Sequence, residues 1–485
     1  MRQGIKRIAY HIFTLIIAVL MATTKLCAQQ DQTLYFMQGL PLVSTVNPAY
    51  QPEHGSVYVG FPVLSSIYIN AGTSIKGVSY NSVSKGSPDL SKIVNSSGSY
   101  ESAGFNFTAN IFNFGYLYKD MYFTLDMSVK ANADARAPKD VLKLAWYGNA
   151  PTIGQPTSLS GLGSKADTYL EVALGFSKEV VRDKILIGGK IKRLMGLAHA
   201  AGELGNGSFI NTDPETWAIT AGVNPKLNVA GLPLQFPSGA FEFDTANVEM
   251  GDYAFGFAGG GWAIDAGFQI NFERWVLSGS ILDLGGIKWR NGQSIAPVNG
   301  YITGTFDGLD KSTSSDATDK KNENIIIDSL LKNARFIAKK ESFTSWFSPK
   351  ITLAATYEIN KHLDVGALLG LAVNQYNTVP LVTAAVTSKN YPVNGTLTYS
   401  YSSHNNSIGV GLLVGRKGTQ MHLICDNVLA ADYKNARHTS VRFGFNFLFG
   451  KPRDAHPKPK KLGPMNTIED SPRPTVVDKR PLRQQ

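Results

Sequence analysis

Histidine and acidic side chains are the groups in this sequence that could bind a metal ion, but they are scattered along the chain. No His-Glu-x-x-His motif and no Cys/His cluster with zinc-ligand spacing occurs, so the sequence predicts no zinc site. His422 and Asp426 share one face of a predicted strand, and such a lone pair is more typical of a structural hydrogen bond. Four acidic residues miss the spacing of an EF-hand loop and are interpreted as a solvated acidic loop: Asp307, Asp310, Asp316 and Asp319.

Motifs for nucleotide binding and nucleophilic catalysis are also missing from the sequence. The run Gly259-Gly260-Gly261 lacks a following Lys-Ser/Thr pair, and a strand is predicted after it where a phosphate loop needs a helix. No Gly-x-Ser-x-Gly motif occurs, although a Ser, a His and an acid from separate strands could still assemble a hydrolase site. We therefore predict a protein without enzymatic activity and without a cofactor.

The composition favours a folded chain that is rich in strands and turns. Apolar residues make up 43% and charged residues 17% of the 485 residues, and the chain contains 47 Gly. The net charge of +10 belongs to the two ends, because residues 29–450 carry only about one positive charge in excess. No basic patch with interleaved aromatic residues lies in that body, so we expect no nucleic-acid partner.

Residues 1–28 have the pattern of a secretory signal peptide. Arg2, Lys6 and Arg7 precede an apolar run from Ile8 to Met21, and Leu26-Cys27-Ala28 is a plausible cleavage site. A lipid anchor on Cys27 and an uncleaved anchor helix are the alternatives. Cleavage would leave Cys425 alone, so no internal disulfide is expected. No later segment has 18 consecutive apolar residues, so the chain could span a membrane only as a closed barrel.

Alternation of apolar and polar residues with period 2 predicts many antiparallel strands in residues 29–450. In Tyr122–Ala131, Phe123 and Leu125 share one face while Asp126 and Lys130 share the other, which fits lipid outside and water inside. Trp262, Trp275 and Trp289 are interpreted as interfacial or loop-packing residues rather than substrate contacts. Counted with weaker candidates near Val57, Ile67 and Trp217, the strands predict a total of about 14, within two either way. The clearer candidate strands are 105–118, 122–131, 169–176, 185–192, 262–271, 275–283, 350–359, 363–373, 381–387, 395–402, 408–414, 421–427 and 441–449.

The last candidate strand, Val441–Phe449, is the clearest. Outer-membrane barrels commonly end on such an aromatic strand, which resembles the signal read by the barrel-assembly machinery. The alternative is an inner strand of a soluble sandwich, which would need a large opposing sheet to bury this face. The face is formed by Val441 and four phenylalanines, Phe443, Phe445, Phe447 and Phe449. The predicted fold is thus an all-β, antiparallel transmembrane β-barrel of about 14 strands, located in the cell outer membrane.

Two segments interrupt the strands, and one follows them. Residues 137–149 predict a short helix with Pro138 at its start and Gly148 near its end. The segment Ser312–Lys340 is polar and then helical in its spacing, and both segments are interpreted as short helical loop insertions or a plug. Residues 451–485 contain seven prolines among many charges and are predicted to be a disordered basic tail. That tail could bind an envelope protein or have no specific role.

Short sequence blocks carry a resemblance to a known family. The sequence resembles a family of uncharacterised Bacteroidetes-type outer-membrane barrel proteins, a domain of unknown function, over residues 30–450. The first block is also similar to the PorP/SprF family, which is linked to type IX secretion and gliding. The blocks are Leu34-Tyr35-Phe36-Met37, Asn47-Pro48-Ala49-Tyr50-Gln51-Pro52, Gly60-Phe61-Pro62, Ser65-Ser66, Asn70, Gly189–Leu194, Ala263–Gly267, Ser280–Gly285 and Ile287-Lys288-Trp289. The resemblance implies the membrane location and the fold, and it implies no catalytic residue.

The block from Asn47 to Pro52 predicts a fixed, kinked segment before the first strand, because Pro48 and Pro52 each remove a backbone donor and restrict their neighbours. A place in the barrel mouth or lumen and a plain structural turn are both open. Two functional hypotheses follow. The first is a structural or accessory component of an envelope or type IX secretion-like assembly, and the second is a transport channel for small apolar or amphipathic molecules.

Overall fold

The computed structural model describes residues 31–74, 98–232, 234–235, 242–243, 258–290, 292–297, 300, 302–306, 336–373, 378–402, 405–415, 417–428 and 438–450. The predicted signal peptide, the acidic loop at 307–319 and the predicted basic tail lie outside these residues.

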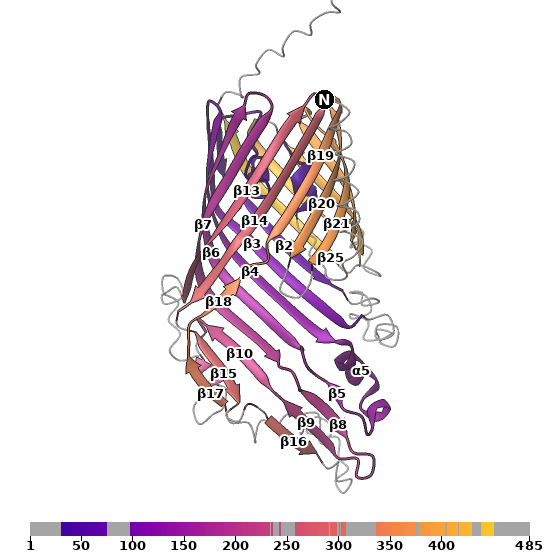
Figure 1. Cartoon of the computed structure of the whole chain (residues 1–485). Coiled ribbons are helices and arrows are strands. Elements are labelled where there is room, and N and C mark those ends of the chain that lie inside the picture. Colours follow the sequence, from indigo (N-terminus) through magenta and orange to yellow (C-terminus); the bar gives the residue numbers. More distant parts are fainter. Residues whose placement is uncertain are drawn as a thin grey trace, which may run out of the picture. The chain divides into compact units, whose positions relative to one another are not determined.

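Fourteen antiparallel strand positions close into a barrel within the described residues (Figure 1). The strands are β1 (Val57–Gly60) with β2 (Ser66–Thr73), β3 (Tyr100–Tyr118), β4 (Met121–Pro138), β6 (Gly163–Val181), β7 (Ile185–Leu204), β13 (Gly259–Phe272), β14 (Trp275–Trp289), β19 (Lys350–Asn360), β20 (Leu363–Val373), β21 (Thr378–Ser388), β22 (Val393–Ser402), β23 (Asn405–Val414), β24 (Gly418–Cys425) and β25 (His438–Phe449). β1 and β2 share one position, because both pair with β3 on one side and with β25 on the other. The predicted barrel of about 14 strands is confirmed.

Tight turns join the strands at one end of the barrel. Lys119, Asp183 and Glu273 lie in three of these turns with positive φ, the conformation that a two- or three-residue hairpin requires. β1 begins and β25 ends at this same end. The longer connections, such as those between β4 and β6 and between β7 and β13, lie at the other end. There β3, β4, β6 and β7 extend the wall, because they are 18 to 20 residues long. One wall therefore continues beyond β20 to β25, which have 8 to 12 residues each (Figure 1).

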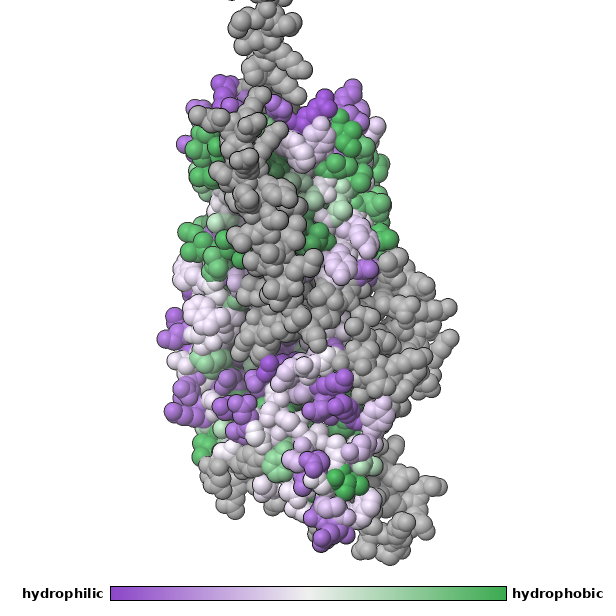
Figure 2. Space-filling view, turned by 45° about the vertical axis from the view of Figure 1, so that its right-hand side comes forward, coloured by the Kyte–Doolittle hydropathy of each residue, from purple (hydrophilic) through white to green (hydrophobic). Residues whose placement is uncertain are grey.

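The barrel wall is apolar outside and polar inside. In β25, Phe443 and Phe445 are exposed, while Arg442 and Asn446 are buried toward the interior. The same alternation recurs in β6, where Leu174 points outward and Glu171 is buried. Figure 2 shows hydrophobic residues gathered over the upper part of the visible face and hydrophilic residues below them and at the upper rim. This band of exposed apolar side chains is the surface that a lipid bilayer covers.

Shorter strands extend the wall at the end with long connections. β10 (Pro225–Ala230) pairs with β7, and β18 (Phe343–Trp346) pairs with β14. β15 (Gln293–Pro297) pairs with both β10 and β17 (Phe336–Lys340). A second sheet orders β16, β9, β8 and β5, and a small hairpin joins β11 to β12. The bounds of these strands are β16 (Ile302–Phe306), β9 (Ile219–Val223), β8 (Phe209–Thr212), β5 (Thr157–Ser158), β11 (Leu234–Gln235) and β12 (Glu242–Phe243).

The helix predicted after Pro138 is present as α5 (Lys139–Tyr147), with Pro138 at its N-cap and Gly148 at its C-cap. A short 3-10 turn, η2 (Ala150–Thr152), follows it. The helix predicted in Ser312–Lys340 is wrong for residues 336–340. These residues pair with β15 as a strand, because strand pairing overrides the local helical spacing. Trp217 was expected in a barrel strand, but it lies in the turn before β9, outside the barrel.

No helix among the described residues is both long and apolar enough to cross a membrane.

Candidate functional site

The first described residues enter the barrel and lie inside it. They form a five-residue helix, α2 (Gln32–Phe36), and a 3-10 turn, η1 (Pro41–Thr45). We call residues 31–52 the plug, and Figure 1 shows its indigo coils enclosed by the strands. Its apolar side chains pack with wall residues into one buried cluster: Leu34, Tyr35, Phe36, Met37, Leu40, Leu42, Val43, Val46 and Tyr50 with Ala354, Leu368, Ala385, Leu413 and Ile424. A lone helix of this length is unstable in water, so the barrel must hold it in place.

The Asn-Pro-Ala-Tyr block forms the last bend of the plug. The Asn47 side-chain oxygen accepts the backbone N–H of Ala49 at 3.0 Å, a local bond that bends the chain around Pro48. Asn47, Ala49, Tyr50 and Gln51 are all buried. The structure thus places this block in the lumen, one of the two positions that the sequence left open.

Hydrogen bonds fix the helical end of the plug to the wall. The backbone N–H of Thr33 donates to Asp426 at 3.0 Å, and Ser440 donates to the second carboxylate oxygen of Asp426 at 2.9 Å. The Thr33 hydroxyl lies 2.9 Å from that of Thr398. These bonds attach α2 to β22 and to Asp426, which directly follows β24 and is held by Ser440 of β25.

The other end of the plug is bonded to the opposite side of the barrel. Ser280 of β14 donates to the carbonyl of Val46 at 2.8 Å, and Ser177 of β6 donates to the carbonyl of Ala49 at 3.0 Å. Gln51 donates to the Ser177 hydroxyl at 3.2 Å. The plug therefore crosses the lumen and bridges strands that are distant in the sheet.

Glycines in the wall make room for the plug. A methyl group at any of five lumen-facing glycines would lie less than 3.0 Å from a plug atom, which is closer than packing allows. These pairs are Gly188 with Pro48, Gly267 with Asn47, Gly366 with Phe36, Gly409 with Thr33 and Gly411 with Met37. The wall is shaped for this particular segment, so the plug is an integral part of the fold.

A cavity of about 1040 Å³ occupies the lumen beside the plug. Gln32, Tyr35, Thr45 and Val46 of the plug form part of its boundary. Strand residues with polar side chains make up most of the remaining wall, together with a few apolar ones such as Leu368 and Leu381. A cavity of this size holds a small organic molecule.

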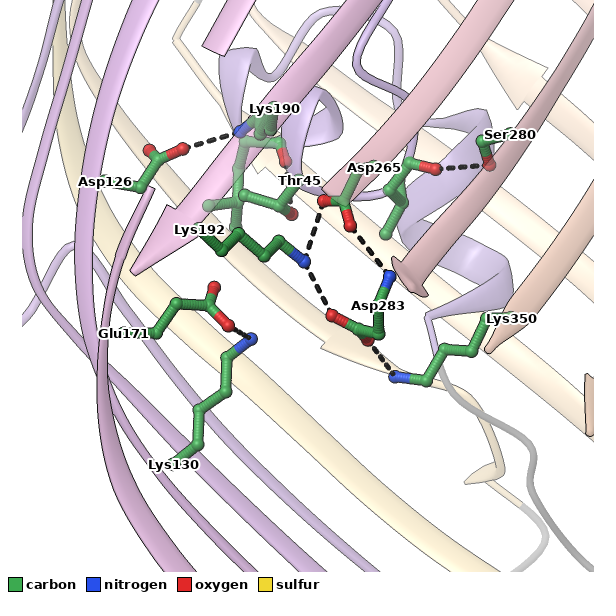
Figure 3. Close-up of polar contacts among 12 residues, drawn as sticks. Thr45, Asp126, Lys130, Glu171, Lys190, Lys192, Asp265, Ser280, Asp283 and Lys350 are labelled. Carbon is green, nitrogen blue, oxygen red and sulfur yellow. Dashed lines mark hydrogen bonds and ion pairs between the residues drawn. The ribbon is translucent and has the colours of Figure 1, made fainter. Parts of the chain in front are cut away.

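Paired charges line one side of the cavity (Figure 3). Lys192 of β7 lies 2.7 Å from Asp265 of β13 and 2.6 Å from Asp283 of β14. Asp283 has φ 63° at a bulge between these two strands, and its backbone N–H donates to Asp265 at 2.7 Å. The bulge turns the Asp283 carboxylate inward, so one ammonium group lies between two carboxylates.

Other ion pairs continue this pattern along the wall. Asp126 lies 2.5 Å from Lys190, and Lys130 lies 2.8 Å from Glu171. These pairs join β4, β6 and β7, and Figure 3 shows them next to the Lys192 group. Lys350 lies 3.7 Å from Asp283 as a further base. Four acids thus face four bases, and this wall is strongly polar without a local excess of either charge.

On the opposite side of the barrel interior, outside the lining of the cavity, the wall carries hydroxyl groups. Thr383 of β21 lies 2.8 Å from Ser400 of β22, and Thr396, Thr398 and Ser402 are also buried there. None of these five side chains carries a charge. The lumen therefore has one ion-paired side and one hydroxyl-lined side, and the plug crosses from one to the other.

The three tryptophans predicted to pack at interfaces or in loops have different environments. Trp262 and Trp275 are exposed on the outside, where Trp262 faces Arg193 and Trp275 packs on Tyr357. Trp289 is fully buried in a second apolar cluster, beside His199. The charge pairs, the glycines and Arg442 were not singled out as a site from the sequence, because only closure of the barrel brings them together.

Among the residues that the structure describes, no group of three His, Cys, Asp or Glu side chains could hold a metal ion. His422 and Asp426 both face the interior. His422 lies 3.3 Å from Asn446, while Asp426 bonds the plug. Of the predicted closing-strand residues, Phe443, Phe445 and Phe449 are exposed on the outer face.

Comparison with protein-family models gives one match, a family of unknown function (DUF5723), over residues 48–426. The chain belongs to this family. The DUF5723 match begins inside the plug at Pro48 and ends before β25. No curated protein matches the sequence.

Among solved structures, this DUF5723 protein is similar to three bacterial barrels at low identity. The Pseudomonas putida toluene transporter TodX is 10% identical over 83% of this chain and 93% of its own, with a TM-score of 0.41. The Ralstonia pickettii toluene transporter TbuX is 8% identical over 84% and 93%, with a TM-score of 0.41. A Pseudomonas aeruginosa FadL homologue is 10% identical over 84% and 93%, with a TM-score of 0.38. The fold assignment rests on the strand pairing itself.

Proposed function

We propose that this protein is an outer-membrane channel for small amphipathic molecules, with the plug as its gate. The observation that carries the proposal is the cavity of about 1040 Å³ bounded by the plug inside a closed barrel. A barrel of 14 strands is wider than the eight-stranded barrels that side chains alone can fill. Here a separate segment fills part of the lumen, and a solute can pass only when that segment moves.

The bonds that hold the plug are compatible with movement. Apart from the ion pair between Asp31 and Arg442, they are single hydrogen bonds with hydroxyl or carboxylate groups, such as those of Thr398, Asp426 and Ser280. A hydrogen bond contributes roughly 0.5–1.5 kcal/mol between neutral groups and about 1.5–3 kcal/mol to a charged group, and water in the lumen can replace each one. The apolar cluster adds a larger share of the docking free energy, so the closed state is the resting state.

The lining of the cavity indicates the kind of solute. Ion pairs and hydroxyl groups surround most of the space, while Val46, Leu368 and Leu381 offer apolar contacts beside the plug. A purely apolar molecule would leave the polar wall without partners, and a small ion would leave the apolar contacts unused. A small molecule with both kinds of surface satisfies both.

The same geometry supports the location and the orientation. Barrels of the bacterial outer membrane have short turns on the periplasmic side and long connections outside. The end with the tight turns, where β1 begins and β25 ends, is therefore assigned to the periplasm. Export through the signal peptide expected in residues 1–28 belongs to this proposal.

The alternative, an accessory role in a secretion-like assembly, has less support. It was motivated by the block from Asn47 to Pro52, but Asn47, Tyr50 and Gln51 are buried in the lumen and inaccessible to a protein partner. The matching family model is not that of PorP/SprF. A partner for residues 451–485 stays a prediction, and co-purification with and without that tail tests it.

A disulfide between plug and wall tests the channel. Thr33 and Thr398 have hydroxyl oxygens 2.9 Å apart, so cysteines there can form a disulfide with little rearrangement. T33C/T398C, with Cys425 replaced by Ser, would be reconstituted in liposomes beside the two single-cysteine variants. We expect hexanoate and hexanol to enter the liposomes faster than protein-free controls, the oxidised double variant to block this excess flux, and reductant to restore it. If the oxidised double variant shows equal flux before and after reduction, the plug is not the gate. If no variant gives more flux than protein-free liposomes, the protein is not a channel for these molecules.

A further inference from the structure

One corner of the cavity combines a buried cation with several polar atoms that have no partner. It lies where the plug meets the seam between β2 and β25, and it contains Asp31, Gln32, Tyr68, Asn70 and Arg442. The Arg442 guanidinium donates to Asp31 at 2.5 Å and to Ser66 at 2.9 Å, and it lies over the Tyr68 ring at 4.3 Å. We call these five cavity-lining residues the arginine corner.

Five polar atoms of this corner make no hydrogen bond with any described residue. They are both amide atoms of Gln32, the Tyr68 hydroxyl, the Asn70 side-chain oxygen and Nε of Arg442. All four residues are at most 6% exposed. Buried polar groups are nearly always bonded, so a group of unbonded ones at a cavity wall marks the place where a polar ligand binds.

The chemistry of these atoms identifies the ligand group. Arg442 offers Nε–H and, if Asp31 withdraws, Nη2–H as two parallel donors, the geometry that matches a carboxylate. The hydroxyl of Tyr68 and the amide of Gln32 add two more donors. Asp31 already shows that a carboxylate binds this guanidinium in the resting state.

We propose that the arginine corner binds the carboxylate head of an amphipathic solute and that this head displaces Asp31 from Arg442. The inference rests on the proposed channel function and names the solute class more narrowly. One guanidinium cannot neutralise two carboxylates, so binding exchanges the plug's carboxylate for the ligand's. The apolar part of the solute then lies along the cavity toward Leu368 and Leu381, which line the same space.

This exchange links solute binding to the plug. Asp31 immediately precedes α2, and its carbonyl accepts the N–H of Tyr35 at 3.2 Å. Thr33, two residues after Asp31, is bonded to Asp426 and Thr398. Loss of the Asp31 ion pair removes the first attachment of the helix, so a bound carboxylate favours release of the plug, and release in turn favours carboxylate binding.

The binding test uses hexanoate, with hexanol as the neutral control, and measures affinity by calorimetry in lipid nanodiscs. Tyr68→Phe removes a hydroxyl that has no partner in the resting structure, so the variant should fold with unchanged or higher thermal stability. We expect hexanoate to bind Tyr68→Phe about tenfold more weakly, the effect of losing one hydrogen bond to a charged group, and hexanol to bind both proteins alike. Gln32→Leu should behave in the same way.

Lys226→Gln is the matched control, because Lys226 lines the same cavity away from the corner. If Lys226→Gln weakens hexanoate while Tyr68→Phe and Gln32→Leu do not, the arginine corner is not the site. Unchanged hexanoate affinity in all three variants, or equal affinity for hexanol and hexanoate in the native protein, overturns the proposal as well.

The displacement test measures how fast a water-soluble maleimide labels Thr33→Cys, again with Cys425 replaced by Ser. Hexanoate should raise the labelling rate severalfold, hexanol should not, and Asp31→Asn should raise it without any ligand. If hexanoate leaves the labelling rate unchanged, the proposed displacement of Asp31 from Arg442 is wrong. If hexanoate fails to bind while the disulfide still controls flux, the corner proposal is wrong and the channel proposal stands.

Discussion

Gly188 of β7 and the carbonyl oxygen of Pro48 approach so closely that no side chain fits between them. A methyl group on Gly188 would lie less than 3.0 Å from that oxygen. The contact joins the first turn-proximal residues of β7 (Ile185–Leu204) to the last bend of the plug. At Gly188 the backbone of β7 is paired with β6 on one side and with β13 on the other.

Gly188→Ala should therefore displace the plug and leave the barrel closed. Overpacking of this kind costs about 1–3 kcal/mol, and the plug is the softer of the two partners. We expect chymotrypsin to cleave the variant near Tyr35 and Phe36, while the heat-dependent shift in gel mobility persists. Gly370→Ala is the control, because its nearest atom would be 3.6 Å away. Equal protection of both variants would show that the plug tolerates the methyl group.

The ion pairs around Lys192 should stabilise the barrel strongly. Lys192→Met leaves Asp265 buried beside Asp283, whose remaining basic partner is Lys350 at 3.7 Å. Removing one partner of a buried ion pair costs about 3–5 kcal/mol. Asp265→Asn in the same protein should recover part of the loss, because the two sites share one interaction. Urea unfolding in lipid vesicles measures the free energy of unfolding of Lys192→Met and of the double variant. Additive effects of the two substitutions would contradict the geometry of Figure 3.

A charged side chain on the outward face of the wall should destabilise the barrel. Leu174 is 64% exposed on the outside of β6, and an arginine there should cost about 2–4 kcal/mol if it lies near the bilayer midplane. Asn106 of β3 lines the cavity, so Asn106→Arg should cost much less. The same unfolding assay compares the two, with Leu174→Ala to account for lost packing. A similar cost for both arginines would mean that the inside and outside are wrongly assigned.

Alkaline pH should release the plug through Tyr35. Burial raises the pKa of the Tyr35 phenol to about 12, although hydrogen bonds with Ser278 and Asn47 act the other way. Because the folded pKa is above the ordinary value of 10, the neutral phenol is favoured when the plug is docked. This contribution is fully present below pH 10 and is lost as the pH rises through about 12.

Measuring solute flux between pH 9 and pH 12.5 tests whether the plug is released as the pH rises. Tyr35→Phe is the control, since its ring cannot ionise and all other titrating groups are retained. We expect flux to rise in the native protein over this range and to rise less in Tyr35→Phe. Identical curves would exclude Tyr35 as the cause.

Much of the barrel could be predicted from local sequence. Alternation with period 2 located strands such as β6, β13 and β20. Strand ends were harder, because the outer parts of β3 and β4 lose the apolar alternation where they leave the lipid. The strand at Phe336–Lys340 was missed, since its helical spacing is local and its pairing with β15 is not.

The site was less predictable because its parts are distant in the sequence. Asp31 and Arg442 are 411 positions apart, and no spacing rule connects them. Pro48 and Pro52 did indicate a fixed bend, but only the wall glycines show that the bend lies inside. Asp283 resembled an ordinary strand residue, and the bulge that turns it inward depends on its partner strand.

The attachments of the plug also constrain the order in which the molecule can assemble. Asp31 and Thr33 bind Arg442 and Asp426, which are synthesised 411 and 393 residues later. Closing a loop of some four hundred residues is entropically unfavourable and slow unless the strands between are already paired. The plug can therefore dock only after β25 has paired with β2. A docked plug thus indicates that the barrel is closed between these two strands.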